Sequence, residues 1–589
     1  MLNIISSRQI SGSRRPSCDR WLYIGGHRGL DRALGTLEQD RRIYIAKDIE
    51  EVTDSVREIF VDYIGRLSRQ QDDAVLWYSS RMASRSISQS RMFQRYVYCK
   101  VLERISRRYE TENLLFVTDD VDLLYVACSK FSQGMGFRER ASLLLKHLGE
   151  RMTGAYWIAK YLIFWVLFRF FRKKELEQFD VFIHSWVNAN TFRKLPEFND
   201  PHLGDLDASI QDKGGTVGRL LPLMVPVNIL FKLNRHYSNI ICPFGYLPFR
   251  GLLSTLAREF DLEMDDGRYG AEEDISLLRL LSRMEKDTEN RTKVYLYYLL
   301  LYGSYQEIQP VLAEKVTFIY PFENQPWEKM LNLAFSDHGR IGYQHSTIPY
   351  NFLDYRTSRY EAPDRFLPQV VLSNGKKWTR FLEQNNPGMK VREAGAIRYS
   401  YLFEDDIEQE VAVSEKVVSV VLPIDPQVAV SLQKQVLRCL ENGLLDEYRV
   451  KIKPHPFLMK SASLSRELGG YDNCEFVSED LKSMLKTSEV LVTSGSTAVF
   501  EGVFTGVKTL YLVPEAFSWG YEHFIKDHVV KSYEEDFPGK LKSILADSGG
   551  PQVDIREFFS PPDHGIFLEY VFANGRGRDV CAGTKKDGC

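Results

Sequence analysis

The chain lacks several features that would place it in an oxidising compartment, in the secretory route or on nucleic acid. Its eight cysteines form no Cys-x-x-Cys pair, which argues against a structural zinc site, and their scatter along 589 residues fits reduced cytosolic thiols. The formal net charge is −3, so no overall positive field attracts nucleic acid. Residues 1–20 lack the apolar stretch of a signal peptide, and we expect a flexible lead-in there. These absences together predict a cytoplasmic protein.

A membrane-spanning segment is also lacking. One strongly apolar run, Tyr156–Phe171, contains Lys160 and Arg169, and its 16 residues fall short of the roughly 20 that a spanning helix needs. Two interpretations stay open. The run forms either a helix buried in the N-terminal domain or a helix lying on the inner face of the cell membrane, with the Arg172–Lys174 cluster meeting anionic lipids. The second interpretation makes the protein peripheral to the membrane.

Short apolar runs alternate with helical stretches along the first half of the chain. Ile275, Leu278 and Leu281 recur at the spacing of one apolar helix face. Such alternation predicts parallel sheets covered by helices, and therefore an α/β fold. The strands expected in this half are Leu22–Ile24, Ile43–Ala46, Val75–Trp77, Leu114–Val117, Val181–His184, Ile240–Cys242, Thr317–Tyr320 and Ile341–Tyr343.

A polar, turn-rich segment divides this series from a second one. The second series alternates strands and helices between Val417 and Val513, which predicts a compact Rossmann-like domain. The expected division is a lead-in at 1–20, an N-terminal α/β domain at 21–370, a linker at 371–415, a C-terminal Rossmann-like domain at 416–535, and a helix with a disordered tail at 536–589.

The segment VLVTSGSTAVFEGVF has the pattern of a phosphate-binding loop. A strand ends at Thr493, a loop of small and hydroxyl residues runs from Ser494 through Gly495 and Ser496 to Thr497, and a helix follows. Small residues let the backbone approach a ligand, and the start of a helix offers free N–H groups to a phosphate. The alternative is that the hydroxyls only cap the helix.

The segment YRVKIKPHPF places a lysine and a histidine at a strand end. Lys453 and His455 are separated by one residue, and Pro454 and Pro456 restrict the backbone around them. A rigid Lys/His pair can neutralise a leaving phosphate without a metal ion. We therefore expect Lys453 and His455 at the same site as the serine-rich loop.

Further candidates follow the strands of the first domain. His345 stands at a strand end in GYQHS, Arg398 lies in GAIRYSY, and Glu323 follows a strand and precedes a helix. Each has a structural alternative, which for Glu323 is a charge favoured by the helix dipole. Asp266 lies in an Asp-Asp-Gly turn that is either catalytic or merely solvated, and Asp119–Asp120 is a weaker candidate of the same kind.

The ordered set QHS, GAIR, KPHP and TSGSTAVFEG resembles the GT-B transferases of bacterial surface polysaccharides. That group includes Kdo transferases, bacterial sialyltransferases and the CDP-glycerol glycerophosphotransferases of teichoic-acid synthesis. The resemblance covers about 340–515 well and the first 300 residues poorly. The chain departs from the family at Ser346, where the family has Gly, which puts the role of His345 in doubt. No well-placed DxD pair of the metal-dependent transferases is evident.

The resemblance implies two Rossmann-like domains facing a central cleft, with acceptor binding in the first domain and nucleotide-sugar binding in the second. It implies a metal-independent transfer of a Kdo-like or nonulosonic sugar from a CMP-activated donor to a glycan or glycolipid acceptor, with no other cofactor. A CDP-polyol phosphotransferase and a non-catalytic partner in envelope assembly stay as alternatives. The expected catalytic residues are Glu323, Asp266 and His345, and the expected nucleotide-binding residues are Lys453, His455, Pro456, Ser494, Gly495, Ser496, Thr497, Glu501 and Arg398.

Overall fold

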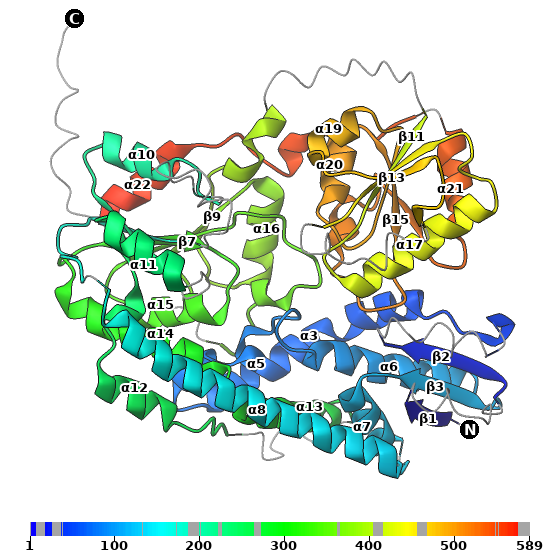
Figure 1. Cartoon of the computed structure of the whole chain (residues 1–589), viewed down its shortest axis with the longest axis horizontal. Coiled ribbons are helices and arrows are strands. Elements are labelled where there is room, and N and C mark those ends of the chain that lie inside the picture. Colours follow the sequence, from blue (N-terminus) through cyan, green and yellow to red (C-terminus); the bar gives the residue numbers. More distant parts are fainter. Residues whose placement is uncertain are drawn as a thin grey trace, which may run out of the picture.

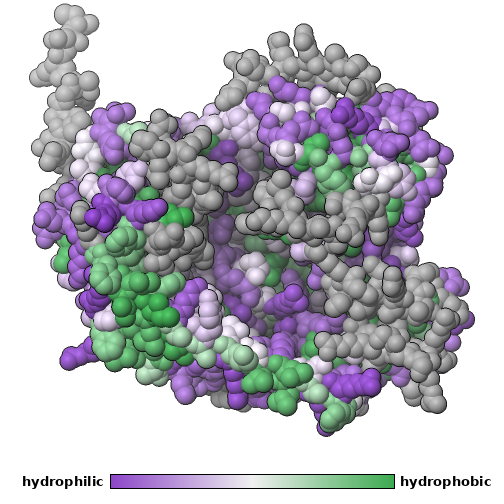
Figure 2. All heavy atoms as spheres, viewed as in Figure 1, coloured by the Kyte–Doolittle hydropathy of each residue, from purple (hydrophilic) through white to green (hydrophobic). Residues whose placement is uncertain are grey.

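Three parallel sheets, each covered by helices, organise the described part of the chain (Figure 1). The computed structural model describes residues 2–6, 18–25, 37, 39–131, 133–171, 173–185, 200, 202–221, 227–263, 273–361, 366–403, 416–455, 468–547, 549–551 and 553–574. Two of the sheets are Rossmann-like and form separate lobes, and a space-filling view shows a hollow between them (Figure 2). The predicted α/β class with two Rossmann-like domains facing a cleft is confirmed.

The third and smallest sheet comes first in the chain; its strands β2 and β3 were expected, but β1 and a separate sheet were not. Strand β3 (Leu114–Thr118) lies between β1 (Leu2–Ser6) and β2 (Arg20–Ile24), so part of the expected lead-in is a strand. Leu2 and Ile4 pack against the main core, which explains why this segment pairs. We call this part the small-sheet module; its helices are η1 (Gln39–Arg41), α3 (Ala46–Gln70), α4 (Ala74–Tyr78), α5 (Arg81–Ser84), α6 (Met92–Arg108), α7 (Val121–Lys130) and α8 (Phe137–Phe168).

Two expected strands in this module are not strands. Val75–Trp77 lies in helix α4, whose N-cap is Asp73 with its carboxylate accepting from the Leu76 N–H at 2.9 Å. The expected strand Ile43–Ala46 is absent as well. The chain forms a single β-bridge to β2 just before it, at Arg42, and α3 begins at Ala46. A short apolar run is compatible with a buried helix as well as with a strand. For Val75–Trp77, the capping hydrogen bond of Asp73 favours the helix.

The first Rossmann-like sheet has seven strands in the order β10-β9-β8-β7-β4-β5-β6. The strands are β4 (Val181–His184), β5 (Val217–Leu220), β6 (Ile240–Ile241), β7 (Thr317–Pro321), β8 (Gly339–Tyr343), β9 (Val370–Ser373) and β10 (Val391–Glu393). The helical segments around it are α10 (Leu206–Asp212), α11 (Val227–His236), η2 (Pro243–Gly245), α12 (Phe249–Leu256), α13 (Glu273–Thr292), α14 (Tyr295–Ile308), η3 (Gln309–Val311), α15 (Pro326–Ala334), η4 (Leu353–Tyr355), α16 (Lys376–Asn385) and η6 (Ile397–Phe403).

The second Rossmann-like sheet has six strands in the order β13-β12-β11-β14-β15-β16. The strands are β11 (Val417–Val421), β12 (Arg449–Lys453), β13 (Cys474–Phe476), β14 (Val490–Thr493), β15 (Lys508–Leu512) and β16 (Val530–Ser532). The helical segments that follow or cover them are α17 (Pro426–Glu441), α19 (Leu481–Lys486), α20 (Ala498–Phe504), η7 (Tyr521–Ile525), α21 (Phe537–Ala546), η8 (Ile555–Glu557) and α22 (His564–Asn574).

Each Rossmann-like sheet reverses its strand order at one place. In the first sheet the chain runs β4, β5, β6 in one direction and then returns to place β7 against β4. In the second sheet it runs β11, β12, β13 and returns to place β14 against β11. In open parallel sheets, ligands bind beyond the carboxyl ends of the strands at such a switch point. Two ligand-binding positions are therefore expected, one after β7 and one after β14.

The two helices nearest the C-terminus pack on different lobes. Phe537 and Leu541 of α21 belong to the core of the second sheet. Helix α22 instead returns to the first sheet, where Phe567 and Val571 share a core with strands β4, β7, β8 and β9, and the rings of Phe567 and Tyr343 lie 5.2 Å apart. The chain thus crosses between the lobes a second time after completing the second sheet.

The small-sheet module contacts both lobes. On the first lobe, Ser358 donates a hydrogen bond to Asp62 of α3 at 2.9 Å. On the second lobe, the Glu515 carboxylate accepts from the Ile45 N–H at 2.7 Å, and Lys531 pairs with Glu50 at 2.5 Å. The module therefore supports the lobes from one side and limits how freely they move apart.

The Glu515 contact predicts a pH-dependent stability. Burial and the neighbouring Glu534 carboxylate raise the pKa of Glu515 to about 7. A carboxyl whose pKa is higher in the folded state binds more protons there than in the unfolded chain, so the free energy of unfolding falls as pH rises from about 4.5 to 7. We expect Glu515→Gln to be more stable than wild type by roughly 3 kcal/mol at pH 8 and by less than about 1 kcal/mol at pH 5.

Thermal unfolding at the two pH values, at one scan rate, measures this effect. The control is Glu535→Gln, since Glu535 forms a surface ion pair with Lys47 at 3.5 Å and its loss is expected to change stability little at either pH. An equal gain for Glu515→Gln at pH 5 and pH 8 would contradict the ionisation account.

The apolar run Tyr156–Phe171 falls mostly within α8, a helix of 32 residues that begins well before it. One side of α8 packs on α13, α12 and η2 and buries Tyr161 and Phe168, whereas Leu148 and Ile163 on the other side stay 55% and 59% exposed. The helix is therefore buried on one side only. It is not the fully buried helix of the first interpretation, and its exposed side leaves the membrane interpretation open. No described helix combines the length and apolar character that crossing a bilayer requires.

Candidate functional site

Glu323 lies directly beyond β7, at the first switch point. The turn after β7 needs a left-handed residue, Asn324 (φ +56°), and leads into a capping box in which Gln325 and Glu328 satisfy the start of α15. Glu328 also accepts from the Glu323 N–H at 3.0 Å. Because Glu328 supplies the carboxylate at this helix start, the carboxylate of Glu323 is not needed there.

His345 follows the neighbouring strand β8 and lies beside Glu323. Its Nε2 is 3.7 Å from Glu323 Oε1, too far for a hydrogen bond, and its Nδ1 has no hydrogen-bond partner in the described part of the chain. The His202 ring packs against it edge-on, with centroids 4.4 Å apart. Burial and the charges of His202 and Arg398 lower the pKa of His345 well below its ordinary value, so this imidazole is neutral at physiological pH.

The Glu323 carboxyl keeps 40% of its side-chain surface exposed, so a ligand in the hollow can reach it. Desolvation by the surrounding protein raises the pKa of Glu323 from its ordinary value, and the positive charge of Arg398 opposes that rise. A carboxyl with a raised pKa that faces a cleft is suited to proton transfer. Glu323 and the neutral His345 thus present an acid-base pair at the end of the first sheet.

Arg398 and Tyr401, on η6 after β10, connect the two lobes. Tyr401 donates its phenol hydrogen to Glu501 Oε2 at 2.7 Å, and Glu501 belongs to α20 in the second lobe. Burial raises the pKa of Glu501, while the Tyr401 hydrogen bond and the charges of Arg398 and Lys453 lower it. The positive charge of the exposed Arg398 acts on Glu323 as well, so it favours the ionised form of one carboxyl in each lobe.

Lys453 is the last residue of β12, and its ammonium donates to the Glu479 carbonyl. His455 follows it and is half-buried, and burial lowers its pKa. Pro456, the remaining residue of this motif, lies outside the described residues. The strand end thus brings one cation and one imidazole to the edge of the second sheet, next to β11 and its switch point.

The loop after β14 occupies the second switch point, but its residues differ in what they can offer a ligand. The Ser494 hydroxyl is buried and donates to the Leu512 carbonyl at 2.7 Å, so it holds the sheet together. Gly495 is left-handed (φ +57°) and its N–H donates to the Tyr511 hydroxyl at 3.0 Å. Ser496 and Thr497 are half-buried, and the Thr497 side chain makes no capping hydrogen bond.

Other predicted residues do not join this site. Asp266 lies outside the described residues, so its role stays a prediction. Asp120 caps α7 and pairs with Arg95 at 3.2 Å in the small-sheet module, which gives it a structural role. His202 and Tyr401 were not expected. Tyr401 stands three residues after Arg398 in the GAIRYSY motif, whereas nothing in the sequence around His202 marks it.

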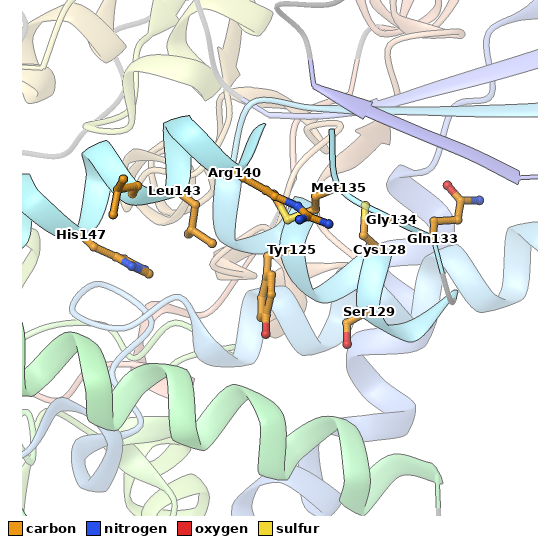
Figure 3. Close-up of a pocket in the computed structure, with 10 residues that line it drawn as sticks. Tyr125, Cys128, Ser129, Gln133, Gly134, Met135, Arg140, Leu143 and His147 are labelled. Atoms are coloured by element: carbon orange, nitrogen blue, oxygen red, sulfur yellow. The ribbon is translucent and has the colours of Figure 1, made fainter. Parts of the chain in front are cut away.

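A cavity of about 520 Å³ lies elsewhere, between α7 and α8 (Figure 3). Tyr125 and Cys128 line it from α7, and Arg140, Leu144 and His147 line it from α8. None of these residues belongs to the cleft. Among the described residues, no group of three or more His, Cys, Asp or Glu side chains could hold a metal ion.

Comparisons with known proteins give only distant similarities. No protein-family model and no curated protein matches the chain. The solved structures it resembles include MurG of Acinetobacter baumannii (12% identity, 67% of this chain and 99% of that chain, TM-score 0.35). They also include UDP-GlcNAc 2-epimerase of Neisseria meningitidis bound to UDP-GlcNAc (11%, 67% and 100%, 0.38). Such values are too low to carry an argument about function, which rests on this chain's own residues.

Proposed function

We propose that the chain is a glycosyltransferase that moves a Kdo-like or nonulosonic sugar from a CMP-activated donor to a surface polysaccharide or lipid-linked acceptor. The observation that carries the proposal is the charge arrangement across the hollow. A carboxyl with a raised pKa stands at the first switch point, and Lys453 stands beside the second, with Arg398 between the lobes. That arrangement fits a reaction in which a phosphate leaves on one side and a proton is removed on the other.

The donor phosphate is assigned to the second lobe. When the bond between the sugar and the phosphate breaks, negative charge grows on the leaving oxygen, and preorganised donors stabilise it. Such donors follow the carboxyl ends of β12 and β14, the two strands on either side of β11: Lys453 and His455 after the first, and the hydroxyls of Ser496 and Thr497 after the second. Arg398 adds positive charge from the lobe boundary. The bound group is the nucleotide of the sugar donor, and these side chains neutralise it without a metal ion.

Acceptor activation is assigned to Glu323. One acceptor oxygen can lie about 2.8 Å from both Glu323 Oε1 and His345 Nε2, to the side of the line that joins them, because these two atoms are 3.7 Å apart. The carboxylate would take the proton of the acceptor hydroxyl as that oxygen attacks the sugar carbon, and the neutral imidazole would orient it. The raised pKa of Glu323 brings the carboxylate closer to the basicity that this step needs.

The same cations would also hold the diphosphate of a CDP-polyol, which keeps a phosphotransferase as the second candidate. Both reactions release CMP, so nucleotide release does not distinguish them. Phosphorus analysis of the purified product does, because a glycosyltransferase leaves no phosphate in the acceptor and a polyol phosphotransferase adds one.

Nucleotide-dependent stabilisation tests the donor assignment. We expect CMP and CDP to raise the melting temperature more than UDP or GDP do, since a ligand present at a hundredfold excess over its Kd stabilises the fold by roughly 2.7 kcal/mol. Chelator should leave the shift and the turnover unchanged. A larger shift with UDP would refute the cytidine donor, and the absence of a shift with every nucleotide would favour a non-catalytic partner.

A further inference from the structure

An exposed apolar stripe runs along α8, outside both Rossmann-like lobes. Apolar side chains recur at helical spacing over about 35 Å of the helix, each between 38% and 69% exposed. Figure 2 shows apolar surface gathered below and to the left of the hollow, where α8 and α12 lie in Figure 1. The residues of this α8 stripe are Leu144, Leu145, Leu148, Met152, Tyr156, Leu162, Ile163, Val166 and Leu167.

Helix α12 widens the stripe at its C-terminal end. Phe249 and Leu253 of α12 are each 47% exposed, and the ring of Phe249 lies 4.8 Å from that of Trp165 on α8. Apart from Lys160, this half of α8 is apolar, with one side packed on the protein and the other facing outward. A contiguous apolar surface of this kind is unusual on a soluble monomer and marks an interaction site.

The charged side chains that α8 itself exposes are all of one sign. The exposed charged residues of 137–170 are four arginines, at 138, 140, 151 and 169. The two carboxylates of this stretch do not face outward, because Glu139 is buried and Glu150 is paired with Arg291 at 2.6 Å. An apolar strip on a helix whose own exposed charges are all cations is complementary to a layer of anionic lipid, in which acyl chains lie beneath negative phosphates.

The cations are also arranged along aromatic rings. Arg169 lies 4.2 Å from the ring centre of Trp165, and Lys160 lies 4.3 Å from that of Trp157. Long cationic side chains that lie on apolar rings can keep their charge at the level of lipid phosphates while the rings enter the layer. The cavity between α7 and α8 adjoins the stripe, since Leu144 belongs to both, and Arg140 lines it (Figure 3).

A second copy of the chain fits this surface less well. In a two-fold pair, the same surface faces itself. If two α8 helices lay antiparallel, Arg151 would come close to its own counterpart, because it stands near the middle of the helix. No exposed carboxylate of α8 would compensate that contact, and like charges across an interface are costly.

We propose that the α8 stripe, with Phe249 and Leu253, is a docking surface for an anionic phospholipid membrane. The helix lies in the plane of the interface with its apolar side among the acyl chains and its arginines at the phosphates. The hollow between the lobes opens on the same face of the molecule (Figure 2), so docking brings the cleft close to the lipid surface. The proposal depends on α8 and α12 and does not rest on the nucleotide assignment.

Sedimentation of the full-length protein with vesicles tests the proposal. The vesicles are phosphatidylcholine alone or phosphatidylcholine mixed with phosphatidylglycerol. We expect binding to the anionic vesicles at low salt and weaker binding at high salt. Arg151→Gln and Arg169→Gln should each weaken binding roughly fivefold. Ile163→Glu places a charge in the stripe and should weaken it by roughly tenfold or more.

The matched control is Phe476→Glu, because Phe476 is an exposed apolar residue (36%) on strand β13 of the second lobe. It should bind vesicles like wild type, and all variants should keep the wild-type melting temperature, since each change is at the surface. Absence of sedimentation at low salt, or unchanged binding of Ile163→Glu, would overturn the proposal. So would a wild-type dimer that Ile163→Glu dissociates without any vesicle binding, because the stripe would then join two copies.

Discussion

Glu323→Gln is expected to lower kcat by roughly 100-fold or more while leaving nucleotide affinity nearly unchanged. The amide keeps the size of the side chain but cannot accept a proton from the acceptor hydroxyl. Affinity is unaffected because Glu323 stands after β7 in the first lobe, whereas the proposed nucleotide contacts follow β12 and β14 in the second. The measurement is turnover beside nucleotide affinity by titration, for wild type and variant.

The pH profile gives an independent readout. The pKa of Glu323 is raised, so wild-type kcat should fall as the pH decreases through that raised pKa, where the carboxylate becomes protonated. The residual activity of Glu323→Gln should not follow this titration. Glu383→Gln is the control, because Glu383 is an exposed carboxylate on α16 of the same lobe. If Glu323→Gln keeps near-normal turnover, the assignment is wrong and Asp266→Asn becomes the variant to measure.

The sequence predicted both Rossmann-like sheets, because the signal of their central strands is local, but it did not predict β5, β9 or β10 of the first sheet. Fully buried strands such as Val417–Val421 and Val490–Thr493 read as short apolar runs, and each is bounded by turn or capping residues. In the small-sheet module, β2 and β3 were expected as strands, but β1 was missed for the opposite reason. Strand β1 forms its hydrogen bonds with β3, which lies more than a hundred residues away, and no residue next to Leu2–Ser6 indicates that partner.

The site was predictable only in part, because a motif gives a residue's place in the chain and not its contacts. Glu323 and His345 follow adjacent strands, and parallel strands end at one edge, so their proximity could be foreseen. The ring contact of His202 with His345 could not be, since it depends on how a loop folds over the sheet. Ser494 looked like a ligand for phosphate, but its hydroxyl is taken by the Leu512 carbonyl inside the domain.

His455→Ala is expected to weaken stabilisation of the leaving phosphate by about 2–4 kcal/mol, as when one preorganised oxyanion donor is removed. Lys453→Met should cause a loss of the same kind, with a larger share in nucleotide affinity because a full positive charge disappears. Lys451→Met is the matched control. Lys451 points to the same side of β12 two residues earlier, but its ammonium pairs with Glu479 at 3.2 Å, so its loss should leave nucleotide affinity unchanged.

Turnover, nucleotide affinity and melting temperature for the three variants separate the possible outcomes. Equal losses for Lys451→Met and Lys453→Met would mean that general charge on β12 matters and that no specific phosphate contact exists at the strand end. If His455→Ala keeps both affinity and turnover, the nucleotide does not bind at this strand end. The second switch point would then hold another group. The assignment of Glu323 to the acceptor side would fail as well, because it assumes that the donor phosphate lies across the hollow.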